Sequence, residues 1–285
     1  MMTSAIVFPN SRRPGRPSGR RVRSLLQQGL LAISAALLLP GCASTGAGSS
    51  SEPKTDSDRT DADRRSSVRI ELATGYFTRG QYETALDEIK QALVLKPDLR
   101  EAINLRNLVY AAMGGTAMAE EGFKRALNSA PSDGDAMHNY AWFLCQQGRW
   151  TPSRALFDQA LALPNYRGMA RTLLARGVCE ARNGEWPAAE RSLSKAFELE
   201  PGNPAVALNL AEVLYRQQQY ERARFYVRRI NTQADFVNAQ SLWLELRIER
   251  RLNNGVAVDD LSQQLRRRFS DAAETQRLRD GRFDD

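Results

Sequence analysis

The chain has 285 residues and a formal net charge of +7 at pH 7. Residues 1–41 hold six arginines and no acidic residue, so the remainder of the chain carries only +1 (7 − 6). Because charges of both signs are interspersed in that remainder, the composition gives no support for a nucleic-acid partner.

The first 41 residues have the composition of a secretion signal. Their six arginines precede an apolar run from Leu25 to Leu39 that is too short for a comfortable membrane span. The run ends in Leu39-Pro40-Gly41-Cys42, which resembles the lipobox that directs lipidation and cleavage at a bacterial lipoprotein cysteine. We therefore predict that residues 1–41 are a lipoprotein signal peptide and that Cys42 carries the lipid. An uncleaved anchor, or a secretion signal cleaved at an Ala-x-Ala-type site, is the alternative.

Residues 43–65 are rich in Ser, Thr, Gly, Asp and Arg and contain no apolar run. Such a segment cannot bury enough surface to fold alone, so residues 42–65 are predicted to be a lipidated cysteine followed by a flexible tether. Ala43 is not the aspartate associated with retention at the inner membrane. By that resemblance the protein is expected at the outer membrane, lipid-anchored and facing the periplasm.

A block of 34 residues recurs between residues 66 and 269. Each copy combines a turn, small and apolar residues at helical spacing, and in most copies a final proline; in the first copy these are Gly80, Tyr82, Ala85, Ile89 and Pro97. The signature resembles the tetratricopeptide repeat, a helix–turn–helix unit. Because one helix pair cannot bury both of its faces, several copies must stack. We predict an all-α fold, a right-handed superhelical solenoid of about six tetratricopeptide repeats.

The spacing of the copies predicts the boundaries within the solenoid. The copies begin near Ser66, Arg100, Gly134, Ala170, Pro204 and Ala239. The third interval is 36 residues, which predicts a longer loop at residues 164–168. The sixth copy is degenerate, as terminal repeats commonly are, and the polar residues 270–285 are expected to form a short capping helix and a frayed tail.

Two cysteines besides Cys42 need an explanation. Cys145 and Cys179 are 34 residues apart, one repeat, on the predicted first helices of neighbouring units. An oxidising periplasm favours a disulfide between them, although the longer loop means that they are not strictly equivalent positions. Two small buried side chains, or a reactive thiol, are the alternatives, and the absence of a Cys-x-x-Cys motif argues against redox catalysis and zinc.

The sequence gives no indication of catalysis. It contains no P-loop, no Gly-x-Gly-x-x-Gly and no Gly-x-Ser-x-Gly motif, and a single histidine excludes metal sites built on several histidines. We therefore expect no enzyme activity, no cofactor or metal, and no small-molecule substrate.

The first helix of each unit is expected to line a concave groove that fits an extended or helical peptide of a partner protein. In the repeat frame, the predicted groove residues are Ile70, Thr74, Phe77, Asn104, Leu108, His138, Trp142, Glu212, Tyr215 and Arg216. For each residue taken singly, packing between repeats is the alternative, and for His138 it is a hydrogen bond at the groove edge.

Several phrases outside the repeat signature point to one family. They lie at residues 139–145, 166–167, 177–179, 204–208, 235–244 and 264–269. Together with the lipobox they resemble the type IV pilus biogenesis/stability lipoproteins, the PilF/PilW family. The cysteine pair also resembles the pair in those family members that carry a disulfide between repeats.

The resemblance implies a pilotin-like function. Such an outer-membrane lipoprotein helps the type IV pilus secretin, the exit pore of the pilus, to localise and to assemble into its multimer. The groove would then hold a segment of the secretin or of another pilus assembly protein. A lipoprotein scaffold for outer-membrane barrel assembly or cell-wall remodelling, also built from these repeats, is the alternative function.

Overall fold

The protein is described here from a computed structural model, in which residues 60–283 are placed. The predicted signal peptide, Cys42 and the tether up to residue 59 lie outside these residues. The described part of the chain contains thirteen α-helices. They are α1 (Asp61–Thr78), α2 (Tyr82–Leu95), α3 (Arg100–Ala112), α4 (Thr116–Ser129), α5 (Gly134–Gln146), α6 (Trp150–Ala162), α7 (Met169–Arg182), α8 (Trp186–Leu199), α9 (Pro204–Arg216), α10 (Tyr220–Asn231), α11 (Ala239–Arg251), α12 (Gly255–Arg268) and α13 (Ala273–Arg279).

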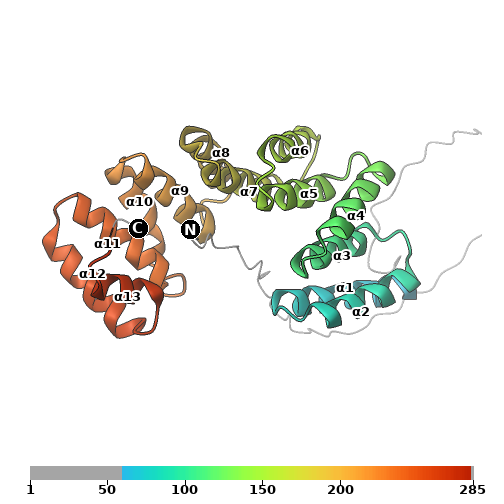
Figure 1. The fold of residues 1–285 in the computed structure, drawn as a ribbon, viewed down its shortest axis with the longest axis horizontal. Coiled ribbons are helices and arrows are strands. Elements are labelled where there is room, and N and C mark those ends of the chain that lie inside the picture. Colours follow the sequence, from blue (N-terminus) through green and yellow to red (C-terminus); the bar gives the residue numbers. More distant parts are fainter. Residues whose placement is uncertain (1–59, 284–285) are drawn as a thin grey trace, which may run out of the picture. The chain divides into compact units, whose positions relative to one another are not determined.

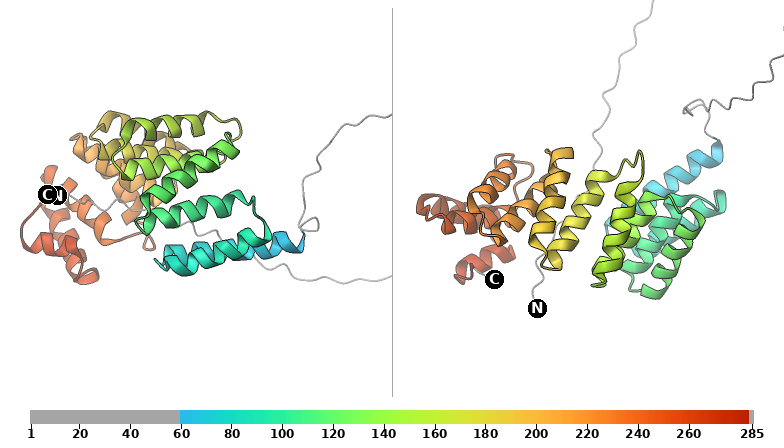
Figure 2. Two further views of the ribbon diagram at one scale, coloured as in Figure 1. Left: turned by 45° about the vertical axis from the view of Figure 1, so that its right-hand side comes forward. Right: turned by 90° about the horizontal axis from the view of Figure 1, so that it is seen from above.

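The first twelve helices pack as six successive pairs, from α1 with α2 to α11 with α12, and each pair contacts the next (Figure 1, Figure 2). The first helices of neighbouring units also touch one another, from α1 with α3 to α9 with α11. This arrangement confirms the predicted all-α solenoid of tetratricopeptide units. It also brings the odd-numbered helices into one row, which is the geometry that a shared groove requires.

The turn within each pair depends on one residue with a positive φ angle. In the first four units this residue is glycine, with φ between 71° and 80°. In the fifth and sixth units Gln218 (φ 61°) and Asn253 (φ 58°) take the same conformation. A residue with a Cβ adopts this region at a cost, which asparagine reduces. The turn therefore survives where the sequence signature is lost, and Gly255 begins α12 instead of forming the turn.

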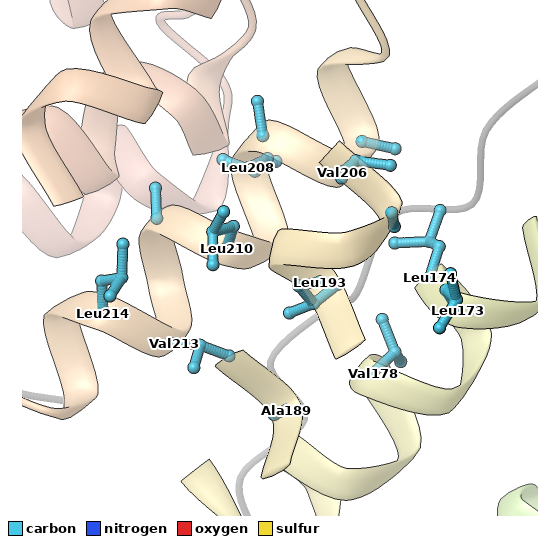
Figure 3. Packing of buried hydrophobic residues seen from close by; sticks show 14 of the residues in the cluster. Leu173, Leu174, Val178, Ala189, Leu193, Val206, Leu208, Leu210, Val213 and Leu214 are labelled. Atoms are coloured by element: carbon cyan, nitrogen blue, oxygen red, sulfur yellow. The ribbon is translucent and has the colours of Figure 1, made fainter. Parts of the chain in front are cut away.

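Small residues let the two helices of a pair approach closely. At the crossing, the five units with the clearest signature place Ala85, Ala119, Ser153, Ala189 and Ala223, all fully buried. In the fourth unit α7 contributes a glycine as well, and a Cβ added to it would lie 2.6 Å from the Cγ atom of the leucine opposite on α8. Figure 3 shows the outcome, a packed cluster to which α7, α8 and α9 all contribute labelled side chains.

The core is continuous from α5 to α11 but is interrupted within the second unit. The buried apolar side chains of α3 cluster with α1 and α2, whereas those of α4 cluster with α5. Between the two clusters lie the buried side chains of Asn104 and Asn107. Asn104 Oδ1 and Asn107 Nδ2 have no hydrogen-bond partner among the described residues. The Asn107 side chain fits beside Gly122 of α4 because glycine has no side chain. A Cβ added to Gly122 would lie 2.1 Å from Asn107 Oδ1.

The first helix begins earlier than predicted. It starts at Asp61, not at Ser66, because Thr60 and Asp63 form a capping box. Thr60 Oγ1 accepts a hydrogen bond from the Asp63 amide at 3.1 Å, and Asp63 Oδ2 accepts one from the Thr60 amide at 3.1 Å. Residues 61–65, predicted to be tether, therefore belong to α1.

The C-terminal end is better packed than its composition suggests. The expected short helix is α13, which buries Leu278 against α11 and α12. Phe283 then stacks on Trp243 with ring centroids 5.5 Å apart, and the guanidinium of Arg250 lies 4.1 Å from the Phe283 centroid. The tail is thus packed, and not frayed, as far as Phe283.

The connections between units also differ in length. Residues 163–168 join α6 to α7, whereas the connections after α2, α4 and α8 each have two residues fewer. This is the longer loop predicted around residues 164–168. The connection after α10, residues 232–238, is longer still and was not predicted.

Cys145 on α5 and Cys179 on α7 form a disulfide, with their Cα atoms 5.9 Å apart. The predicted pairing is confirmed, and the alternatives of core thiols or a reactive thiol are set aside. Both residues are buried, and the Oγ atom of Ser153 lies 3.6 Å from Cys179 Sγ. The bond links two neighbouring first helices and so fixes part of the row of odd-numbered helices.

The disulfide is expected to contribute about 2–4 kcal/mol to the free energy of unfolding, because it restricts the unfolded chain across a loop of about 34 residues. The double variant Cys145→Ala/Cys179→Ala should therefore unfold at lower urea concentration than the oxidised protein. Alanine is preferred to serine because both sites are buried and a hydroxyl would lack a partner. Two titratable thiols in the denatured, unreduced Cys42→Ala protein would contradict the pairing.

Candidate functional site

A cavity of about 360 Å³ opens along the row formed by α1, α3, α5 and α7. Four of the predicted groove residues lie together in its wall, namely Phe77, Leu108, His138 and Trp142. The remaining lining residues are Ala111, Ala112, Asn139, Phe143, Gln146, Arg171, Leu174, Ala175 and Val178. The surface of the cavity is therefore mostly apolar and is built by the first helices of four successive units.

The fourth unit contributes residues that the sequence analysis did not name. Leu174 and Val178 of α7 line the cavity. They stand 36 residues after His138 and Trp142, which is the length of the third interval. Carrying the repeat frame across the longer loop would have found both positions.

A second, polar cavity of about 540 Å³ adjoins the apolar one and shares Leu108, Asn139 and Arg171 with it. Thr74 and Asn104, also predicted for the groove, line this polar part together with charged residues of α3 and α5. Asn104 Oδ1 is buried here and has no hydrogen-bond partner among the described residues. The candidate groove therefore has an apolar half followed by a polar half.

A chain of hydrogen bonds supports the wall between α5 and α7. His138 Nδ1 lies 3.0 Å from Thr172 Oγ1, and the Tyr166 hydroxyl lies 2.9 Å from the same atom. Arg171 donates to the Tyr166 hydroxyl at 3.4 Å and to Asp135 Oδ1 at 2.6 Å. The longer loop thus delivers Tyr166 to the back of the groove, where its side chain joins the two helices.

Two glycines make room for the Tyr166 ring. A Cβ added to Gly134 would lie 2.7 Å from ring carbons, and one added to Gly168 would lie 2.5 Å from the hydroxyl. Real Cβ atoms essentially never approach so closely, so both positions need glycine for Tyr166 to stay. The loop insertion therefore supports α5 and α7 from behind the residues that line the groove.

His138 is held neutral by its surroundings. Burial, the larger cause, and the positive charge of Arg171 together lower the pKa of His138 from the ordinary 6.5 to about 3. The ring also packs edge-on against Phe157, with centroids 6.1 Å apart. His138 lies on the cavity wall as predicted, but as a buried, hydrogen-bonded side chain.

Some predicted groove residues belong to the core. Ile70 is only 3% exposed and packs with α2 and α3, so its placement in the groove was wrong. Trp142 reaches the cavity but is only 9% exposed and is part of the main core cluster. The packing alternative that the sequence left open holds for both.

The predicted residues of the fifth unit lie away from the cavity. Glu212 accepts hydrogen bonds from Arg216 at 2.8 Å and from Arg247 at 2.7 Å. The Arg247 guanidinium also lies 4.6 Å from the centroid of the Tyr215 ring. These contacts tie α9 to α11 and give the three residues a structural role in the fold.

Within residues 60–283 no group of three or more His, Cys, Asp or Glu side chains is arranged to hold a metal ion. In the same part of the chain, no helix has the length and apolarity needed to cross a membrane.

Family models of the tetratricopeptide repeat match residues 134–163 and 181–242. The chain is 26% identical over 238 residues to the type IV pilus assembly protein PilF of Pseudomonas aeruginosa, an alignment that covers 84% of this chain and 92% of that protein.

Solved structures give the same result. The chain is similar to PilW, a widely conserved type IV pilus biogenesis factor, with 29% identity and a TM-score of 0.67 over 75% of this chain and 97% of that one. PilF of Pseudomonas aeruginosa shares the fold, with 24% identity and a TM-score of 0.65 over 78% of this chain and 100% of that one. These similarities confirm the resemblance to the PilF/PilW proteins that the sequence indicated.

Acid is expected to destabilise the protein through His138. Below about pH 6.5 the unfolded chain binds a proton that the folded chain does not, so the folded state loses about 1.4 kcal/mol per pH unit down to about pH 3. His138→Gln, which can keep a hydrogen bond to Thr172 but does not titrate, should remove this contribution. Urea unfolding of both proteins at about pH 7 and about pH 5 measures it. Equal losses of stability in the two proteins would contradict the assignment.

Proposed function

We propose that this chain, a tetratricopeptide-repeat protein of type IV pilus biogenesis, is an outer-membrane lipoprotein of the pilotin kind. It would promote the localisation and multimerisation of the pilus secretin by holding a protein segment in its groove. The similarity to PilF and PilW supports the pathway. The observation that supports the mechanism is the apolar cavity shared by α1, α3, α5 and α7.

The two halves of the groove suit a peptide. The apolar half has room for one or two large side chains, each of which contributes about 1.5–3 kcal/mol when buried. A micromolar complex needs about 8 kcal/mol, so further contacts along the segment are required. Asn104 and Asn139 in the polar half offer amide groups that can pair with the backbone of an extended segment.

The proposed role requires no chemistry from this chain. Binding in the groove would hold one secretin protomer, and a lipid on Cys42 would carry that complex to the outer membrane. The protein would then act through position and local concentration, as a scaffold and not as an enzyme. The tetratricopeptide fold, a protein-interaction fold, supports this view.

Substitutions in the apolar half should weaken partner binding about tenfold to a hundredfold, the effect of losing one buried apolar contact. Phe77→Asp and Leu108→Asp are suitable because both side chains are only half-buried. Each should lower the ratio of heat-stable secretin multimer to monomer on a gel and reduce surface pili and twitching motility. Trp142→Asp is unsuitable because it would place a charge in the core.

Phe225→Asp is the matched control. Phe225 lies on α10, outside the residues that line the cavity, and is 59% exposed. The Phe225→Asp variant should therefore form secretin multimers and pili as the unaltered protein does. If the groove variants keep a native melting profile and still assemble normal multimers and pili, the groove is not the working surface. Capture of barrel-assembly or cell-wall proteins instead of pilus proteins would favour the alternative scaffold function.

Cys42→Ala should release the protein from the outer membrane without unfolding it. The prediction follows from the lipobox resemblance at Leu39-Pro40-Gly41-Cys42 and from the tether that the sequence predicts between Cys42 and the repeats. Membrane fractionation should find the variant in the soluble or a mislocalised fraction. A variant that still fractionates with the outer membrane would show that the lipid is not the anchor.

A further inference from the structure

The first helix of the solenoid exposes apolar side chains on one face. Val68 is 56% exposed and Leu72 is 42% exposed. In the repeat frame, the positions equivalent to Val68 in the five later units are Ala102, Ala136, Thr172, Val206 and Ser241, all fully buried. This is the face with which a first helix packs against the preceding unit, and no described unit precedes α1.

The opposite end of the solenoid is closed by α13 and Phe283, so the two ends are not alike. Residues 43–59, which come just before α1, contain no large apolar side chain. Among residues 43–59 the apolar residues are only alanines and one proline. An exposed apolar end of a repeat array usually needs a polar cap or a partner.

The exposed face has the spacing of a coiled-coil seam. Asp61, Arg65, Val68, Leu72, Gly75 and Arg79 follow one another at intervals of four, three, four, three and four residues. This alternation keeps the five positions from Asp61 to Gly75 on one side of α1, and Arg79 is the residue that caps the C-terminal end of the helix. The apolar pair lies in the middle, with Asp61 and Arg65 toward the first end and Arg79 at the other.

The order of charges makes this face complementary to itself in the antiparallel direction. With a two-fold axis midway between Val68 and Leu72, Val68 of one copy meets Leu72 of the other. The same register places Asp61 opposite Arg79, twice in a symmetric pair. Within its own chain Asp61 makes long ion pairs, at 3.8 and 3.9 Å to its neighbours on α1.

In this register Gly75 lies opposite Arg65, whose side chain is 64% exposed. The guanidinium of Arg79 in the same chain lies beside Gly75, 3.6 Å from the position of an added Cβ, so it would have to move for Arg65 of the partner to cross here. A parallel arrangement would instead set Asp61 beside Asp61 and Arg79 beside Arg79. The charges therefore favour the antiparallel register over the parallel one.

We propose that the occupant of this face is a second copy of the chain, and that two α1 helices pair as an antiparallel, two-fold symmetric contact. Such an interface is isologous, so both copies use the same residues. Phe77 is nine residues from Val68, which places it on the opposite side of the helix. The groove thus stays open in the dimer, and the proposal does not depend on the proposed function.

The contact is expected to be weak. A helix of 18 residues is about 27 Å long, and a single helix pair buries less than the roughly 1,200 Å² of a standard interface. The dimer should therefore form in the micromolar range or above. Attachment of both copies to one membrane would raise their local concentration and favour the pair.

The test uses the full chain with Cys42→Ala, which removes any lipid, in sedimentation velocity over a series of concentrations. The protein with an unaltered α1 face should show a monomer–dimer equilibrium. Val68→Asp/Leu72→Asp should give monomer throughout, and Val256→Asp on α12, at a site 83% exposed, should leave the equilibrium unchanged. A protein that is monomeric at every concentration, or a dimer that Val68→Asp/Leu72→Asp does not affect, would overturn the proposal.

The charges allow a sharper experiment. Asp61→Arg and Arg79→Asp should each weaken self-association about tenfold or more, because each puts like charges together at both ends of the contact. An equimolar mixture of the two variants should dimerise again. In the mixed pair the introduced arginine faces the introduced aspartate at one end, and the unaltered Arg79 faces the unaltered Asp61 at the other. Melting curves check that both variants fold. Loss of the dimer in each variant without recovery in the mixture would refute the antiparallel register and, with it, the proposal.

Discussion

Every helix pair of this solenoid has a face that only the next pair can bury, and the other features of the structure follow from that constraint. Small residues at the crossing of each pair bring the helices close enough for the neighbouring pair to reach both. The row of first helices is a consequence of the same stacking. The apolar cavity is then a surface that stacking leaves open, with its side chains set by four units at once.

The junction between the fifth and sixth units depends on charge as much as on apolar contact. Arg228 forms ion pairs with two glutamates of α11. Its guanidinium nitrogens lie 2.7 Å from a carboxylate oxygen of the fully buried Glu249 and 3.1 Å from one of Glu245. Glu212 on α9 pairs with Arg247 on α11 across the same junction. Each of these ion pairs has one buried partner. Such a pair adds little to stability relative to apolar packing, but removing one residue leaves the other charge buried and unpaired at a high cost in stability. They therefore favour one geometry of the joint over others.

Features that follow from the repeat period could be predicted from the sequence, whereas features that depend on one particular contact could not. The turns, the pairing of helices, the longer loop before α7 and the disulfide all follow from spacing. The start of α1 was missed because the cap formed by Thr60 and Asp63 lies in a stretch of polar composition. Ile70 was misplaced because a rotation of about 100° around the helix axis, one residue, decides between groove and core. The supporting role of Tyr166 was missed because its contacts come from three different segments.

The break in the core within the second unit has a consequence for how the protein unfolds. Asn104 and Asn107 leave two buried polar atoms unsatisfied at the place where one apolar cluster ends and the next begins. Leu108, Tyr110 and Ala111 of α3 still pack against the α4–α5 cluster, but they are only partly buried, so we expect local opening to cost less at this joint than within either cluster. Phe77 and Leu108, on α1 and α3, form one side of the apolar cavity. Ligand affinity and the local folding equilibrium of the first units are therefore thermodynamically linked.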